Sequence, residues 1–298
     1  MSLNRFGGLI TGTFNPLTDQ KTATVEDLVV AGGGGGGGGN GGGGGGAGGL
    51  LTAANFAITL GSTITVTVGA GGAGNASSPS VSTNGTNGSN SVFSTVTSIG
   101  GGYGSVSTSA GNSGGSGGGG CSPARAGGTG TAGQGNNGGT GGSAVSNGYD
   151  SGGGGGGAGS VGTTLNGYFN GTGGTGLVSS ITGSRVLYAG GGSGGSDYRA
   201  TGQIAPLAAA GGGQGSYNSI FGIDGKAGTG GGGGGGGYYG QDLGNIAFTT
   251  SGAGGSGIVI IRYPQNCSAP VATTGNPQIL YNNGYQIYIW TSSGSVTF

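Results

Sequence analysis

A long glycine-rich run dominates the sequence. Residues 31–49 read AGGGGGGGGNGGGGGGAGG, and shorter runs occupy 152–157 and 230–237. Each glycine costs roughly 0.5–1 kcal/mol relative to alanine inside a regular element, and such a run is usually interpreted as a flexible linker. An ordered fold must therefore hold these runs by something other than side chains.

The extended left-handed polyproline II conformation suits a chain without Cβ atoms. It has no internal hydrogen bonds and rises about 3.1 Å per residue, so the run 31–49 would be about 59 Å long if straight. Because buried backbone polar groups must be paired, such helices have to pack side by side. The sequence predicts a slab of parallel and antiparallel glycine helices.

Charge is sparse in this chain. Among 298 residues there are 91 glycines but only seven acidic and seven basic residues, and no charged residue lies between Leu28 and Ala124. The net charge is zero, so neither nucleic acid nor an anionic membrane surface is an expected partner. No stretch of 18 apolar residues occurs, so we expect no membrane insertion.

The residue inventory argues against catalysis. The chain has no histidine, and Glu26 is its only glutamate. General acid–base chemistry and metal binding usually draw on these residue types, so we expect no enzyme activity, no metal and no cofactor. Cys121 and Cys267 could form a disulfide or remain two separate buried thiols, and the sequence leaves both open.

Short apolar segments that alternate with threonine or serine predict β-strands beside the glycine runs. The expected fold is all-β plus irregular: a bundle of polyglycine (polyproline II) helices packed with short antiparallel strands, without significant α-helix. The run 258–261 is continuously apolar, which predicts burial on both faces. Single strands are expected at 25–30, 91–99, 185–189, 257–263 and 294–298, and hairpins at 56–68 (turn Gly61-Ser62) and 279–290 (turn Asn282-Asn283-Gly284).

Four motifs, in order, resemble the glycine-rich domain common in bacteriophage tail-fibre proteins. They are VEDLVVA before polyglycine (25–31), ITVTVGAGGAG (64–74), NSVFSTVTSIGGG (90–102) and SGIVIIRYP (256–264). The alternation of polyglycine and loops is also similar to the tip adhesins of T-even-type long tail fibres, in which a sandwich of glycine helices holds receptor-binding loops. This second likeness concerns architecture only.

The chain divides by composition into an N-terminal arm (1–24), a glycine-rich domain (25–263), and a C-terminal hairpin with a closing strand (264–298). The arm either docks on another virion tail protein or packs on its own domain. In the family that the chain resembles, a strand like residues 288–298 commonly precedes the VEDLVV strand. We therefore expect it to pair with residues 25–30, in cis or across a homo-oligomer interface. Candidate residues for virion attachment are Arg5, Phe6 and Phe14.

Aromatic residues interrupt the glycine segments. Tyrosine amid glycine and serine is typical of recognition loops, because it gives contact area at low entropic cost. The alternative is that these rings cover the ends and faces of the slab. The candidate receptor contacts are Tyr103, Tyr149, Tyr168, Phe169, Tyr198, Tyr217, Phe221, Tyr238 and Tyr239.

These features favour a phage tail-fibre or fibre-tip protein that binds a host-cell surface receptor, either a glycan or an outer-membrane protein. The first residues contain no secretory leader, which favours a virion component assembled in the host cytoplasm. The resemblance implies a homo-oligomer, with a trimer favoured because tail fibres usually are trimers. A non-receptor virion part (head fibre, decoration or connector) and an ice-binding polyglycine protein are the alternatives.

Overall fold

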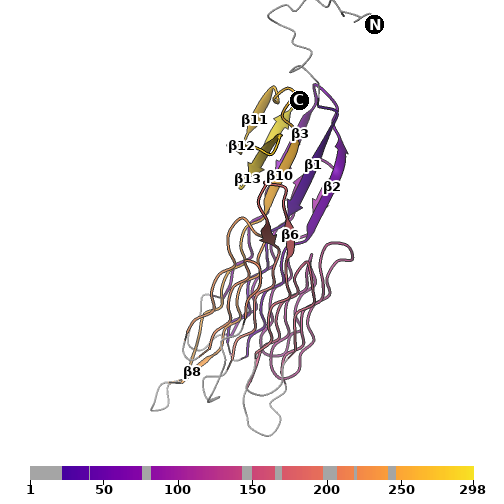
Figure 1. Cartoon of the computed structure of the whole chain (residues 1–298). Helices are drawn as coiled ribbons and strands as arrows, with labels where there is room; N and C mark the ends of the chain where they lie inside the picture. The colour runs from indigo at the N-terminus through magenta and orange to yellow at the C-terminus, as the bar shows by residue number, and fades with distance from the viewer. Residues whose placement is uncertain are drawn as a thin grey trace, which may run out of the picture.

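The computed structural model describes residues 22–39, 41–75, 82–142, 150–164, 170–196, 207–217, 220–240 and 246–298. Within these ranges the chain forms strands and no helix. The molecule is elongated: two sheets gather at one end, and glycine-rich segments run away from them to the other end (Figure 1). We call these segments, between residues 31 and 257, the glycine slab.

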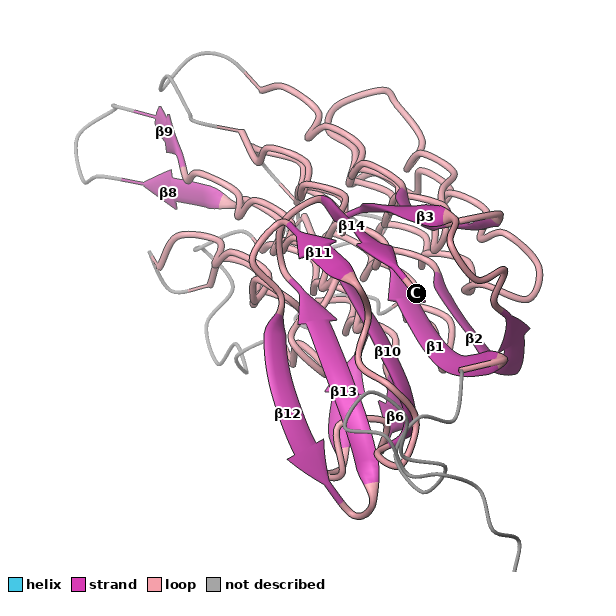
Figure 2. Ribbon diagram, turned by 90° about the horizontal axis from the view of Figure 1, so that it is seen from above, coloured by secondary structure: helices cyan, strands magenta, loops and turns pink. Residues whose placement is uncertain are grey.

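Two antiparallel five-stranded sheets face each other at one end and form a sandwich (Figure 2). The first sheet has the order β12-β13-β10-β1-β2, with β12 at Gln278–Asn282, β13 at Tyr285–Trp290, β10 at Ile258–Pro264, β1 at Thr24–Val30 and β2 at Leu50–Ala57. The second has the order β11-β14-β3-β4-β5, with β11 at Ala272–Thr274, β14 at Gly294–Thr297, β3 at Thr63–Thr67, β4 at Ser91–Phe93 and β5 at Val96–Ser98. Two hairpins complete the fold: β6 (Leu177–Ser179) with β7 (Val186–Tyr188), and β8 (Tyr238–Gly240) with β9 (Ile246–Phe248).

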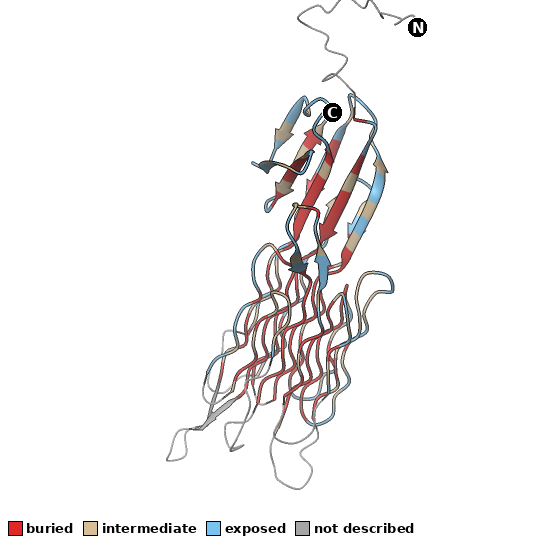
Figure 3. Ribbon diagram, in the orientation of Figure 1, coloured by how far each residue is buried: buried red, intermediate tan, exposed pale blue. Residues whose placement is uncertain are grey.

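Strand β10 is buried on both faces, as its continuous apolar run predicts. Val259 and Ile261 pack between the two sheets, in one cluster with Trp290. Ile258 and Ile260 point the other way, into a second cluster formed with the β7 region and Ala47 of the slab. The first sheet is therefore a central layer, and its burial stands out along β1 and β10 in Figure 3.

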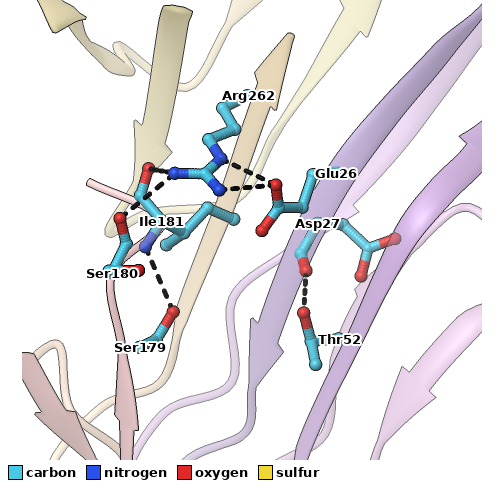
Figure 4. Close-up of polar contacts among 7 residues, drawn as sticks. All are labelled: Glu26, Asp27, Thr52, Ser179, Ser180, Ile181 and Arg262. Carbon is cyan, nitrogen blue, oxygen red and sulfur yellow. Dashed lines mark hydrogen bonds and ion pairs between the residues drawn. The ribbon is translucent and has the colours of Figure 1, made fainter. Parts of the chain in front are cut away.

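A partly buried ion pair fastens the β6–β7 connection to this layer (Figure 4). Arg262 on β10 donates from Nε to Glu26 Oε2 of β1 at 2.7 Å, and its Nη2 lies 2.7 Å from the same oxygen. Its Nη1 donates to the carbonyls of Ser180 (3.1 Å) and Ile181 (3.3 Å). Because one guanidinium bonds both to Glu26 of β1 and to the connection between β6 and β7, it positions this hairpin on the sheet.

The carboxyl group of Asp27 lies inside the sandwich. The residue is fully buried, and neither carboxyl oxygen has a hydrogen-bond partner of ordinary geometry among the described residues. Figure 4 shows its side chain directed away from the neighbouring ion pair. Burial raises the pKa of Asp27 to about 6; the backbone of Ala53 lowers it by less, and the charge of Glu26 raises it further. In the folded state this carboxyl group therefore stays protonated up to a higher pH than in the unfolded chain, where its pKa is near 3.8.

Three expectations about the strands are wrong. Residues 56–68 do not form a hairpin, because β2 pairs with β1 in one sheet and β3 pairs with β14 in the other. Residues 91–99 are not one strand but two, β4 and β5, which pair across a turn at Ser94, where φ is 54°. The closing strand β14 does not pair with β1: Val296 lies opposite Ile64 of β3, in the sheet that faces Leu28's sheet.

The other strand expectations are confirmed. β1 covers residues 25–30, β7 lies within 185–189, and β14 lies within 294–298. The hairpin 279–290 forms with Asn282 opposite Tyr285. Its two turn residues, Asn283 and Gly284, both have positive φ (51° and 81°), which is the geometry that an asparagine–glycine turn favours.

The slab is held by backbone hydrogen bonds whose partners change with a period of three residues. From residue 31 to 38, every third amide donates to the same neighbouring segment, and three neighbours receive these bonds in turn. Ala31, Gly34 and Gly37 donate to Gly49, Gly46 and Gly43. Gly32, Gly35 and Gly38 donate to Ser89, Thr86 and Thr83. Gly33 and Gly36 donate to Gly255 and Gly252.

The carbonyl groups of the same segment serve three other neighbours. Gly32 and Gly35 accept from Gly101 and Gly104, Gly33 accepts from Gly72, and Gly34 and Gly37 accept from Gly233 and Gly236. One glycine segment thus contacts six others, three antiparallel and three parallel to it. The long run is not one straight rod of about 59 Å: it reverses at Gly39 and Gly41, where φ is positive (101° and 56°), so that its two halves become neighbours.

The close approach of these segments explains the glycine content. A Cβ atom built on Gly45 would lie 2.0 Å from the carbonyl oxygen of Gly34, and one on Gly34 would lie 2.2 Å from that of Gly102. Ala47 is tolerated because its methyl group packs in the apolar cluster against the first sheet. Side chains inside the slab are therefore small: Ser105, Ser116 and Ser193 are fully buried there.

Candidate functional site: the distal end of the glycine slab

The slab segments are joined by connections at both of its ends, and we call the end that lies away from the sandwich the distal end. The reversal at Gly39 and Gly41 lies there, and hydrogen bonds from Gly42 to Gly236 (3.0 Å), Gly43 to Ser105 (3.0 Å) and Ser122 to Gly41 (3.1 Å) bring the neighbouring segments to the same level. The hairpin β8–β9 projects from the same end (Figure 1). Thr22 and Phe298 lie together at the sandwich, lining one cavity at the opposite end.

Four of the predicted aromatic contacts lie toward the distal end. Tyr238 and Tyr239 begin strand β8, directly after the glycine run. Tyr217 forms an antiparallel bridge with Ile220, and Phe221 next to it is 58% exposed. These aromatic residues stand on connections whose flanking glycines are hydrogen-bonded into the slab, so a rigid support carries them.

The remaining predicted residues are placed differently. Tyr103 is half-buried midway along the slab, where its amide donates to Asn87 Oδ1 at 3.0 Å. It is therefore part of the lateral face rather than of the distal end. The other candidate contacts and the candidate attachment residues lie outside the described residues: Tyr149, Tyr168, Phe169, Tyr198, Arg5, Phe6 and Phe14.

A hollow of about 330 Å³, lined mostly by residues with polar side chains, opens at the distal end. We call it the Arg125 hollow, and its polar lining consists of Ser82, Ser107, Thr108, Ser122, Arg125 and Asp150. These residues come from four connections that are far apart in the sequence. The Ser122 hydroxyl donates to Asp150 Oδ1, which joins two of these connections directly.

Cys121 supports the hollow from behind. Its amide donates to Ser105 Oγ at 2.9 Å, and its thiol donates to the carbonyl of Ser107 at 3.2 Å. Burial raises the pKa of the Cys121 thiol, while hydrogen bonding to Ser105 and the charge of Arg125 lower it and that of Asp150 raises it. The group is therefore a protonated donor that positions the Ser107 turn, rather than a reactive thiolate.

Residues 9–264 match a sequence family described as "Glycine-rich domain". The chain belongs to this family. The match spans both halves of the molecule, from β1 to the end of β10, and includes all the slab segments between them. A search of curated proteins found no match to this glycine-rich domain.

The sequence-based reasoning missed the Arg125 hollow. It treated residues 121–125 and 147–150 of the glycine-rich domain as interruptions and selected aromatic residues alone. A usable signal was present: Arg125 and Asp150 are the first two charged residues after Asp27, at the ends of two such interruptions.

Cys121 and Cys267 are both free, one buried and one partly buried, so no disulfide joins them. Across the described residues, no group of three or more potential metal-binding side chains comes together. The described part of the chain also has no helix long and apolar enough to cross a membrane.

Proposed function

We propose that the slab segments are polyglycine II helices, that is, glycine chains in the polyproline II conformation. This conformation has three residues per turn, which matches the three-residue period of hydrogen-bond partners along residues 31–38. A pleated strand directs its backbone groups to two neighbours only, whereas this segment has six. Measured φ and ψ angles near −75° and +145° along this segment would support the proposal, and pleated-strand angles would refute it.

We further propose that the protein is a phage tail-fibre or fibre-tip protein that binds a host-cell surface receptor through its distal connections. The observation that carries this proposal is the orientation of the molecule: both described chain ends lie at the sandwich, and one set of slab connections lies at the opposite end of a stiff slab (Figure 1). Attachment at one end and display at the other is what a fibre tip requires. The family resemblance to tail-fibre domains points the same way.

Stiffness supports this assignment over a flexible spacer. Each slab segment is hydrogen-bonded to several others, and their glycines approach one another at backbone contact distance. A binding surface on such a support loses little conformational freedom when it meets its partner, which favours affinity. A homotrimer attached through the N-terminal arm is part of the proposal, and sedimentation of the full chain tests that state.

Adsorption to bacterial cells tests the receptor-binding proposal. Fluorescently labelled full-length protein should bind saturably to some strains of a panel, and unlabelled protein should displace it. Phe221→Ala, which removes an exposed distal ring, should weaken adsorption. Tyr281→Ala is the matched control, because this 66% exposed ring lies on β12 in the sandwich. Equal loss with both variants, or no saturable binding to any strain, would refute receptor binding and favour a purely structural virion part.

A further inference from the structure

We propose that the Arg125 hollow is a carbohydrate-binding site that takes an acidic sugar. This inference rests on the proposed receptor-binding function and makes it specific: it assigns a ligand class to one place at the distal end. The carboxylate of the sugar would lie against the Arg125 guanidinium, and its hydroxyl groups would bond to Asp150 and the surrounding hydroxyls.

The guanidinium of Arg125 holds unused donor capacity. Its Nε atom is buried and has no hydrogen-bond partner among the described residues, although the side chain lines the hollow. Because Nε itself has almost no exposed surface, a ligand in the hollow would pair with the terminal guanidinium nitrogens. A carboxylate is the acceptor that matches the planar fork of arginine best.

The rest of the lining suits hydroxyl groups. Asp150 offers carboxylate oxygens, the hydroxyls of Ser82, Ser107 and Thr108 can each donate and accept, and that of Ser122, which donates to Asp150, can accept. The exposed ring of Pro123 adds a small apolar surface at the same place. A ligand that carries many hydroxyls and one anionic group uses this combination, whereas an apolar ligand would leave it unpaired.

The walls of the hollow are built before any ligand arrives. Ser107 and Ala124 adopt positive φ (55° and 46°), which non-glycine residues rarely do, and hydrogen bonds to Cys121 fix both turns: its thiol donates to the Ser107 carbonyl and its own carbonyl accepts from the Arg125 amide at 3.0 Å. Backbone geometry of this kind is kept where a site needs a defined shape. The volume of about 330 Å³ lies at the small end of the range for ligand pockets, so one or two sugar rings fit better than a folded partner.

Ligand-observed NMR on the full chain tests the site directly. The probes are D-glucuronic acid, D-galacturonic acid and N-acetylneuraminic acid, with D-glucose as the uncharged comparison. At least one acidic sugar should show saturation transfer that D-glucose does not. Arg125→Ala should weaken that binding by at least about tenfold, and Arg125→Lys by less, because lysine keeps the charge but not the fork. Arg185→Ala, which removes an exposed arginine beside β7, should leave it unchanged.

The results separate this inference from the proposed function. Absence of binding for all three acidic sugars, or equal binding by the Arg125→Ala and wild-type proteins with unchanged circular dichroism, overturns the sugar site. If wild-type protein still adsorbs to cells in that case, the receptor-binding proposal stands without the hollow. If an acidic sugar binds at Arg125 but no cell is bound, the sugar site stands and the receptor-binding proposal fails. Binding of D-glucose as strong as that of the acidic sugars overturns the acidic specificity.

Discussion

Replacing Gly45 with alanine should destabilise the protein severely, although it adds one methyl group. The new Cβ atom would lie 2.0 Å from the carbonyl oxygen of Gly34 and 3.0 Å from the amide nitrogen of Gly233. Ordinary contact begins at 3.4 Å, so the segments must separate by about 1.4 Å. No flexible side chain can absorb this shift, because the atoms that clash belong to the backbone.

The size of the effect follows from the hydrogen bonds that this shift breaks. Gly45 donates to Gly233 at 2.8 Å and accepts from Gly192 at 3.0 Å, and Gly34 donates to Gly46 at 2.9 Å. Each buried backbone group that loses its partner costs about 1–3 kcal/mol. Loss of two such bonds leaves four groups unpaired and lowers the unfolding free energy by at least about 4 kcal/mol, a large share of the roughly 5–15 kcal/mol typical of a folded domain.

Urea denaturation measures this decrease. Trp290, the only tryptophan, is fully buried in the sandwich, so its fluorescence reports unfolding there, while far-ultraviolet circular dichroism follows the whole chain. Gly133→Ala is the matched control: a Cβ there meets nothing within 4 Å, and only its positive φ of 77° adds a cost of roughly 1 kcal/mol. If Gly45→Ala costs no more than this control, tight backbone packing is not what holds the slab together.

Two further perturbations test the sandwich. Because the Asp27 pKa is raised to about 6, the folded protein binds a proton that the unfolded chain releases at lower pH, so stability should fall by up to about 3 kcal/mol as pH rises from about 4 to 7. Asp27→Asn should remove most of this slope in urea titrations at both pH values, and an unchanged slope would contradict the assignment. Arg262→Lys should cost about 1–2 kcal/mol, because lysine cannot serve Glu26 and the Ile181 carbonyl together; wild-type stability would show that this ion pair does not hold the β6–β7 hairpin.

Local patterns predicted individual strands well. The alternation around β1, the continuous apolar run of β10 and the asparagine–glycine turn between β12 and β13 each depend on residues close in sequence. The partners of the strands were predicted poorly. Alternating residues at 56–68 and a turn at Gly61 say that one face is buried, but not that β2 and β3 join opposite sheets. That choice depends on β1 and β14, which lie far away along the chain.

The distal end shows the same division. Aromatic residues in glycine surroundings identified Tyr217, Phe221 and β8 as residues on connections, and the structure places them toward the distal end. The Arg125 hollow could not be read in the same way, because its six polar residues come from four connections. A cavity is a property of how connections meet, and no single stretch of sequence contains that information.

The sequence by itself determined that the glycine runs had to pair through their backbones, since glycine offers no side chain to bury and an unpaired buried amide is costly. It did not determine which run lies beside which, because one glycine segment is chemically like another. Only the tertiary structure decides this: strands such as β1, β5 and β7 fix where the glycine segments after them begin, and the reversal at Gly39 and Gly41 sets the length of the first. The side chains of the sandwich strands therefore determine where the glycine segments lie, because the slab has very few side chains of its own.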